Sequence, residues 1–229
     1  MKVLAIIPAR SGSKGLPDKN IIDLLGRPLM DYTIKAAIDS KCFEEVMVST
    51  DSEKYAKIAI DCGANVPFLR SEFTSSDTAT SWDVVREVIG NYKRKGKNFD
   101  YIALLQPTSP LRTSDDIIRA FRLLDREDVH NVIAVTEVAH PIQWCFPLDK
   151  NCSMESFANS PYYQARRQDL EKYYQVNGAI YLVDASKIEN PEYNLYKDSC
   201  FAYIMPGERS VDIDTEKDLI VVKTFLHIS

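Results

Sequence analysis

Short apolar runs alternate with amphipathic stretches along this chain, and the alternation restricts the possible folds more than any other feature. Residues 3–7 form a continuously apolar run, as in a strand that is buried on both faces. Further strand-like runs lie at residues 46–50, 101–105, 132–135, 179–183 and 201–205. The pattern predicts helices at residues 28–41, 52–62, 80–95, 113–126 and 215–226. Strands that alternate with helices predict βαβ units, so we expect an α/β fold with a Rossmann-like, mainly parallel sheet flanked by helices.

The length of 229 residues fits one α/β domain with a sizeable core, so we expect a single domain over residues 1–229. A formal net charge of −5 argues against nucleic acid as a partner, because proteins that coat nucleic acid are usually basic. The five cysteines are odd in number and form no CxxC pair, which predicts reduced thiols and gives no zinc-binding spacing. No window has the apolar length of a membrane span, so we expect a soluble cytoplasmic protein without membrane contact.

The stretch at about residues 140–175 interrupts the alternation. It is rich in aromatic residues and also carries Arg166 and Arg167. It is too long for a simple connection between two strands. Aromatic and arginine-rich surfaces are typical of subunit interfaces. We therefore predict an inserted arm that extends a hairpin off the sheet and takes part in a homodimer.

The loop at residues 9–20 follows the first predicted strand directly, at the edge where open α/β sheets bind ligands. Gly12 and Gly15 let the backbone approach a ligand closely, and successive amides in such a loop form an anion-binding nest. Three cations lie in the same loop: Arg10, Lys14 and Lys19. The loop therefore suits a polyphosphate, and a solvated polar loop is the alternative. It matches neither the Walker A pattern nor GxGxxG, which argues against a P-loop kinase and a dinucleotide dehydrogenase.

Two aspartates, Asp212 and Asp214, follow the last predicted strand. In extended backbone, side chains two residues apart point to the same side, so both carboxylates can face one ligand. Oxygen ligands shared between protein and phosphate are what Mg²⁺ (or Mn²⁺) prefers, and such an ion would neutralise charge on a triphosphate. The alternative is that Asp214, with Thr215, only caps the last helix.

Four blocks of the sequence together resemble a known family. They are residues 7–15 with Lys19 and Asn20, residues 105–112, residues 177–181 and residues 211–214. In these blocks and in their order, the chain resembles the bacterial CMP-sialic acid synthetases, the acylneuraminate cytidylyltransferases. The resemblance extends over nearly the whole chain. It implies transfer of CMP from CTP to an acidic α-keto sugar, a sialic acid or a relative such as legionaminic acid, with release of pyrophosphate.

The resemblance also implies roles for individual residues. The nucleotide-binding residues would be Arg10, Ser13, Lys14, Lys19, Asn20, Arg70, Ala79 and Ser81. The sugar-binding residues would be Gln106, Gln143, Arg167 and Tyr181, with Arg167 reaching the sugar carboxylate from the partner subunit of a homodimer. The metal ligands would be Asp212 and Asp214, and the catalytic residues would be Arg10, Lys19 and Asp212.

Other interpretations of these residues stay open. Without the resemblance, Arg70 could be a surface charge, Gln106 a loop cap, Tyr181 a core residue and Arg167 an exposed arginine. Gln143 and Gln175 stand where some relatives carry a lysine and an arginine, so less positive charge is available near the sugar. The alternative sugars are therefore 3-deoxy-manno-octulosonate and pseudaminic acid.

Three further alternatives change the activity itself. A sugar-1-phosphate nucleotidyltransferase shares the fold, but we expect it to have a longer glycine-rich loop and to prefer another nucleotide. A glycosyltransferase also uses an Asp-x-Asp metal site, but it releases no pyrophosphate. A non-catalytic nucleotide-binding protein would bind without turnover, and the joint presence of Arg10, Lys19, Asp212 and Asp214 argues against it.

Overall fold

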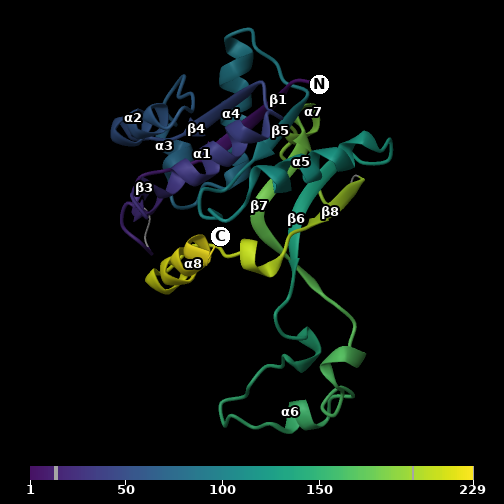
Figure 1. The fold of residues 1–229 in the computed structure, drawn as a ribbon. Coiled ribbons are helices and arrows are strands. Elements are labelled where there is room, and N and C mark those ends of the chain that lie inside the picture. Colours follow the sequence, from purple (N-terminus) through teal and green to yellow (C-terminus); the bar gives the residue numbers. More distant parts are fainter. Residues whose placement is uncertain (13–14, 198, 229) are drawn as a thin grey trace.

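A six-stranded sheet forms the centre of the described part of the chain, residues 1–12, 15–197 and 199–228 of a computed structural model (Figure 1). Its strands lie in the order β4 (Glu45–Ser49), β1 (Val3–Pro8), β5 (Tyr101–Leu104), β7 (Tyr174–Asp184), β6 (Asn131–Glu137) and β8 (Cys200–Ile204). β1 pairs in parallel with β4 and β5, and β6 pairs in parallel with β8. β7 runs antiparallel to both of its neighbours, β5 and β6. The predicted mainly parallel α/β sheet is confirmed, with β7 reversed.

The longer helices lie where the sequence predicts them: α1 (Leu29–Ser40), α2 (Glu53–Asp61), α4 (Ser81–Arg94), α5 (Ser114–Arg122) and α8 (Glu216–Ile228). Side-chain caps fix several of their starts. Ser52 accepts a hydrogen bond from the backbone amide of Tyr55, and Thr80 and Thr113 each form a capping box with the aspartate three residues later. None of the helices in the described part of the chain combines the length and the hydropathy needed to cross a bilayer.

Short elements, which the periodicity does not predict, connect the longer ones. They are the hairpin of β2 (Asp23–Leu24) and β3 (Arg27–Pro28), and the helices α3 (Glu72–Ser75), α6 (Glu155–Ala158) and α7 (Ala185–Ile188). Single 3₁₀ turns lie at η1 (Lys19–Ile21), η2 (Leu123–Asp125), η3 (Ile142–Trp144), η4 (Arg167–Asp169) and η5 (Gly207–Arg209). Helices this short are unstable alone, so their positions depend on contacts with the rest of the molecule.

Side chains of β1 alternate between two hydrophobic layers, one on each face of the sheet. Ala5 and Ile7 pack with residues of α1 and α5, whereas Leu4 and Ile6 pack with residues of α4. All four side chains are fully buried, as a continuously apolar run predicts for a strand covered on both faces. The two layers hold β1 rigidly between helices, so the loop that follows it starts from a fixed point.

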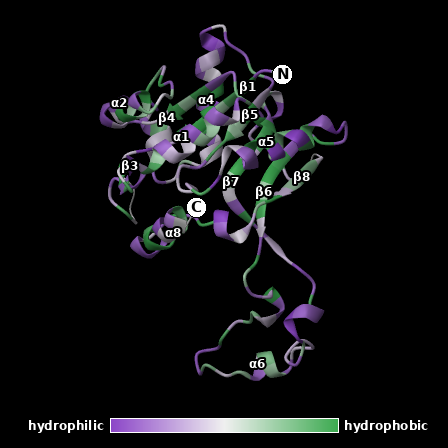
Figure 2. Ribbon diagram, viewed as in Figure 1, coloured by the Kyte–Doolittle hydropathy of each residue, from purple (hydrophilic) through white to green (hydrophobic). Residues whose placement is uncertain are grey.

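The segment between β6 and β7 projects away from the sheet (Figure 1). It runs from residue 138 to residue 173 and carries α6 near its far end. Its exposed apolar side chains include Leu148, Met154, Tyr162 and Tyr163, whereas hydrophobic residues of the main body concentrate in the strands (Figure 2). The segment coincides with the stretch predicted to be an arm. The description of the chain as one domain with an inserted arm at about residues 140–175 stays a proposal.

Candidate active site

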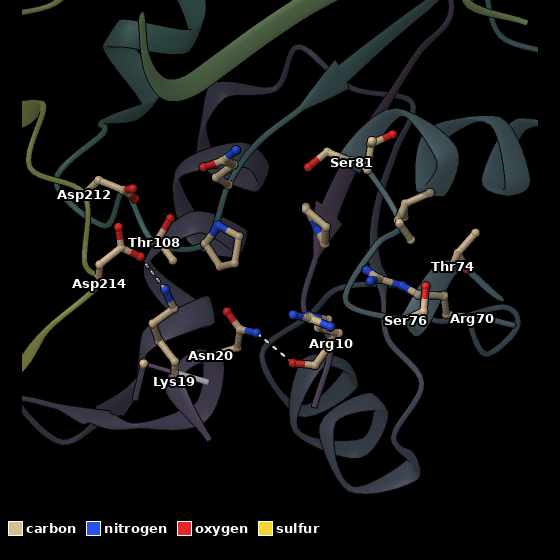
Figure 3. A pocket seen from close by; sticks show the side chains of 17 residues that line it. Arg10, Lys19, Asn20, Arg70, Thr74, Ser76, Ser81, Thr108, Asp212 and Asp214 are labelled. Carbon is tan, nitrogen blue, oxygen red and sulfur yellow. Dashed lines mark hydrogen bonds and ion pairs between the residues drawn. The ribbon is translucent and has the colours of Figure 1, made fainter. Parts of the chain in front are cut away.

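A cavity of about 500 Å³ opens at the carboxyl ends of β1 and β5 (Figure 3). This is the edge at which open α/β sheets bind ligands. Nine of the predicted site residues line the cavity: Arg10, Lys19, Asn20, Arg70, Ala79, Ser81, Gln106, Asp212 and Asp214. The structure thus brings residues from distant stretches of the sequence into one cavity, here called the pocket, while their roles stay predictions.

The loop after β1 and the aspartate segment are in direct contact in the pocket. The Lys19 ammonium donates to the backbone oxygen of Ile213 and pairs with an Asp214 carboxylate oxygen, each at 2.9 Å (Figure 3). At Gly15, an added Cβ would lie 3.0 Å from the backbone oxygen of Asp214, so a larger residue would push the two segments apart. The cationic loop and the two carboxylates therefore face the same ligand space.

Ile213 anchors the aspartate segment in the fold. Its side chain is fully buried in a small cluster that includes Leu16 and Leu29. Its backbone amide donates to the Thr108 backbone oxygen at 2.9 Å, which fixes the segment against the loop that follows β5. Because neighbouring side chains in extended backbone point to opposite sides, burial of Ile213 turns Asp212 and Asp214 into the pocket.

The two aspartates fit a divalent cation that is shared with a bound phosphate. Asp212 is accessible from the pocket, yet the protein around it displaces water, and this desolvation raises its pKa. The neighbouring Asp214 charge also raises that pKa, whereas Thr108 and Lys19 lower it. A cation between the two carboxylates would relieve this repulsion. Within the described residues no group of three or more acidic, histidine or cysteine side chains is arranged to hold a metal ion.

Arg70 lies at the end of the pocket away from Asp212 and Asp214 (Figure 3), and it is 9% exposed. Its guanidinium donates to the Ser49 backbone oxygen at 2.7 Å and to the Ser49 hydroxyl at 3.2 Å. Burial lowers its pKa to about 10, which leaves it charged at neutral pH. The interpretation of Arg70 as a surface charge is therefore wrong, because the end of β4 and the pocket wall enclose it.

The loop after β1 is held by neighbours on several sides. Asn20 is buried and donates to the Arg10 backbone oxygen at 3.0 Å. The Asp51 carboxylate accepts from the Ser11 amide and from the Ser11 hydroxyl, each at 2.8 Å. The Arg10 guanidinium crosses to the far wall, where it pairs with Asp77 at 2.9 Å. These contacts shape the loop before any ligand is bound.

Gln106 lies against the strand that carries Gly178. Gly178 has a φ of +76°, and a Cβ added there would lie 2.8 Å from the Gln106 side-chain oxygen. Arg112, which is 2% exposed, donates to the Gln106 backbone oxygen at 3.2 Å and to the Ala179 backbone oxygen at 2.7 Å. Two of the sequence blocks thus contact each other and present Gln106 to the pocket.

We expect Gly178→Ala to lower the free energy of unfolding by about 2–3 kcal/mol, because a left-handed backbone and a steric overlap act together. Gly96→Ala is the matched control, since Gly96 has a φ of +75° and open space around its Cα. It should cost only about 1–2 kcal/mol, from backbone strain. Chemical denaturation of both variants measures the difference. Equal losses would show that Gln106 moves aside without cost.

Three predicted sugar ligands do not line the pocket of their own chain. Tyr181 is part of β7, and its ring packs edge-on against Trp82, with 5.7 Å between the ring centroids, so the core interpretation fits its position. Gln143 lies in the projecting segment and donates to the Glu171 backbone oxygen at 3.1 Å. Arg167 lies in η4 of the same segment and lines a separate cavity with Glu137. The predicted ligands Ser13 and Lys14 lie outside the described residues.

Sequence reasoning missed several residues of the site. Thr74, Ser76 and Thr108 line the pocket, and Asp51 holds the loop through Ser11. Asp51 follows β4 directly, and polar residues after a parallel strand are candidates for the binding edge, so that signal was available. Thr74 and Ser76 lie in a polar stretch without a distinctive pattern.

Comparison with known proteins gives the chain clear relatives. A family model described as cytidylyltransferase matches residues 4–205. The chain is 36% identical to a pseudaminic acid cytidylyltransferase of Campylobacter jejuni, over 100% of this chain and 98% of that protein. It is 35% identical to a CMP-N,N'-diacetyllegionaminic acid synthase of Legionella pneumophila, with coverage of 100% and 98%. It is 40% identical to an N-acylneuraminate cytidylyltransferase of Streptococcus agalactiae, but spans only 52% of that longer protein.

Solved structures share the fold at lower sequence identity. A CMP:2-keto-3-deoxy-manno-octonic acid synthetase complexed with CTP superposes with a TM-score of 0.72 at 18% identity, covering 100% of this chain and 99% of that one. A 4-diphosphocytidyl-2C-methyl-D-erythritol synthase from Anaerococcus prevotii has a TM-score of 0.66 at 15% identity, with coverage of 99% and 98%. At these identities the likeness shows the fold alone.

Proposed function

This chain belongs to the cytidylyltransferase family. We propose that it transfers CMP from CTP to an acidic nonulosonic sugar. The anomeric hydroxyl of the sugar attacks the α-phosphate, and pyrophosphate leaves. Relatives that are named for pseudaminic, legionaminic and acylneuraminic acids support this substrate class. The observation that carries the proposal is the contact of Lys19 with the aspartate segment, which puts cations and carboxylates around one pocket.

Positioning and charge neutralisation are the main demands of this chemistry. We assign Arg10 and Lys19 to the phosphates and Asn20 to the ribose. In the structure, Arg10 and Lys19 each pair with a carboxylate, of Asp77 and Asp214 respectively. A triphosphate carries more negative charge than either carboxylate, so it would draw both cations toward itself. Binding would thus exchange two internal ion pairs for contacts with the nucleotide.

Asp212 and Asp214 are our proposed ligands for Mg²⁺ (or Mn²⁺), which when bound would neutralise charge on the α-phosphate. Asp212 is also our candidate acceptor for the proton of the sugar hydroxyl, because desolvation raises its pKa. Both roles need the ionised carboxylate. Turnover should therefore fall when Asp212 is protonated or replaced.

We propose that the chain acts as a homodimer in which the projecting segment of one subunit reaches the other. Gln143 and Arg167, the proposed sugar ligands of that segment, lie outside their own pocket. The segment and its base expose several aromatic side chains, among them Tyr162, Tyr163, Tyr173 and Tyr174, and exposed aromatics are typical of interfaces. The molecular mass in solution tests this proposal. Because CTP is an intracellular metabolite, we also propose a cytoplasmic location.

The decisive experiment incubates the protein with CTP, Mg²⁺ and one acidic sugar at a time, and measures both pyrophosphate and the CMP-sugar. Pseudaminic and legionaminic acids come first, because relatives named for them match this chain along nearly their whole length. N-acetylneuraminic acid and 3-deoxy-manno-octulosonate complete the panel, and UTP in place of CTP is the control. Pyrophosphate release with CTP and at least one sugar supports the proposal. Binding of CTP without turnover on any sugar would instead indicate a non-catalytic nucleotide-binding protein.

A further inference from the structure

The Arg70 end of the pocket has a wall made by residues 71–77, a segment that includes the four-residue helix α3. Thr74, which is 3% exposed, and Ser76 both line the pocket from this wall (Figure 3). A helix of one turn is not stable alone. The position of the wall therefore depends on groups outside it.

Glu87 of α4 is one of these groups. Its carboxylate accepts hydrogen bonds from the Ser71 amide and the Ser71 hydroxyl, each at 2.8 Å. It also accepts one from the Thr74 hydroxyl. Hydrogen bonds to a charged acceptor are stronger than neutral ones. One side chain on a long, well-packed helix thus holds both the start of α3 and the buried threonine that lines the pocket.

Arg10 holds the other side of the same wall. Its guanidinium donates to the Ser75 backbone oxygen at 3.2 Å and pairs with Asp77 at 2.9 Å. A bound triphosphate would draw this guanidinium away from the wall. Glu87 does not line the pocket, and it reaches the wall from α4, so we expect nucleotide binding to leave its contacts in place.

We propose that Glu87 is a positioning residue for recognition of the nucleotide base. The Arg70 end of the pocket lies away from Lys19 and Asp214, where the phosphates would bind, so it would take the base, and Glu87 keeps Thr74 and Ser76 in its wall while Arg10 turns to the phosphates. The inference rests on the proposed function, since it requires a cytidine nucleotide in this pocket. Because Glu87 does not line the pocket, it would not touch a bound nucleotide directly. It acts through Ser71 and Thr74, and together with Asp51 it also favours the charged form of Arg70 against the effect of burial.

The test compares Glu87→Gln with the control Glu72→Gln, which removes an exposed carboxylate from α3. Calorimetric titration measures the binding of CTP and of UTP to each protein. We expect Glu87→Gln to weaken CTP binding on the order of tenfold and to weaken UTP binding less, so that discrimination between the two bases falls. The KM for CTP should rise while kcat at saturating CTP stays within about twofold. Glu72→Gln should match the parent protein in every measurement.

Amide hydrogen exchange of the ligand-free proteins gives a second readout that needs no nucleotide. Residues 71–77 should exchange faster in Glu87→Gln than in the parent, while β1 and β5 stay protected. Unchanged CTP affinity and base discrimination in a folded Glu87→Gln protein would overturn the inference, as would unchanged exchange in the wall. If the parent protein binds no CTP, the proposed function fails, and the exchange result still decides whether Glu87 holds the wall.

Discussion

Replacing Asp212 by asparagine should lower turnover about a thousandfold, the scale of losing one preorganised electrostatic group, and should also make the ligand-free protein more stable. Desolvation, with help from the Asp214 charge, raises the pKa of Asp212 above its usual 3.8. The stability that this group contributes is therefore complete below pH 3.8 and is lost as the pH rises through its higher folded-state pKa. Asparagine stays neutral at every pH, so it removes this penalty together with the catalytic charge.

Pyrophosphate release and thermal unfolding at pH 7 measure the two effects of Asp212→Asn. Asp218→Asn is the control, because the pKa of Asp218 is shifted in the opposite direction to that of Asp212 and its replacement should change stability in the opposite direction. Asp218 accepts hydrogen bonds from the Thr215 hydroxyl and from the amides of Asp214 and Thr215, and these lower its pKa. Its contribution is present above its usual pKa and lost as the pH falls, so this variant should be less stable at pH 7. An Asp212→Asn protein with parental turnover, or with a lower Tm, would contradict the expected result.

Replacing Lys19 by methionine should reduce kcat/KM for CTP by about a thousandfold. The Lys19 side chain is 15% exposed and joins the loop to Ile213 and Asp214. Methionine keeps the apolar stem and removes the charge that would meet the phosphates. Lys19→Arg should recover only part of the activity, because a planar guanidinium does not reproduce a compact ammonium.

Steady-state kinetics with CTP varied, and then with the sugar varied, check the Lys19→Met result. Lys54→Met is the matched control, because Lys54 pairs with Asp18 of the same loop but its side chain is 64% exposed. That variant should have parental kinetics, since exposed ion pairs contribute about 0–1 kcal/mol. The role assigned to Lys19 would be wrong if both variants lost activity equally, or if Lys19→Met affected only the KM for the sugar.

Much of the fold could be predicted because its signals are local. The apolar run at residues 3–7 by itself indicates a buried strand. Thr80 and Thr113, each followed three residues later by an aspartate, indicate where two helices begin. The direction of β7 could not be predicted, because an apolar run indicates a buried strand without saying which way it runs. The first residues of β7, from Tyr174 to Val176, are exposed where the strand leaves the sheet with β6. The sequence therefore predicts a strand only at residues 179–183, whereas β7 runs from Tyr174 to Asp184.

In the candidate site, too, some residues could be predicted from the sequence and others could not. Arg10, Lys19, Asp212 and Asp214 could be proposed because their charges lie in short runs beside predicted strands. Glu87 could not, because a glutamate on an amphipathic helix looks like any solvated residue until tertiary packing brings Ser71 to it. In the proposed homodimer, Gln143 and Arg167 would act in the pocket of the partner subunit, and no local pattern within one chain describes such a contact.

The contact between Lys19 and Ile213 spans 194 positions of the chain. All strands of the central sheet precede residue 205 among the described residues, so Asp212 and Asp214 follow the whole sheet in the chain, whereas Lys19 comes before most of it. Closing so long a loop costs entropy that only a completed core can offset. The two sides of the pocket should therefore meet late in folding, only after the sheet between them has formed.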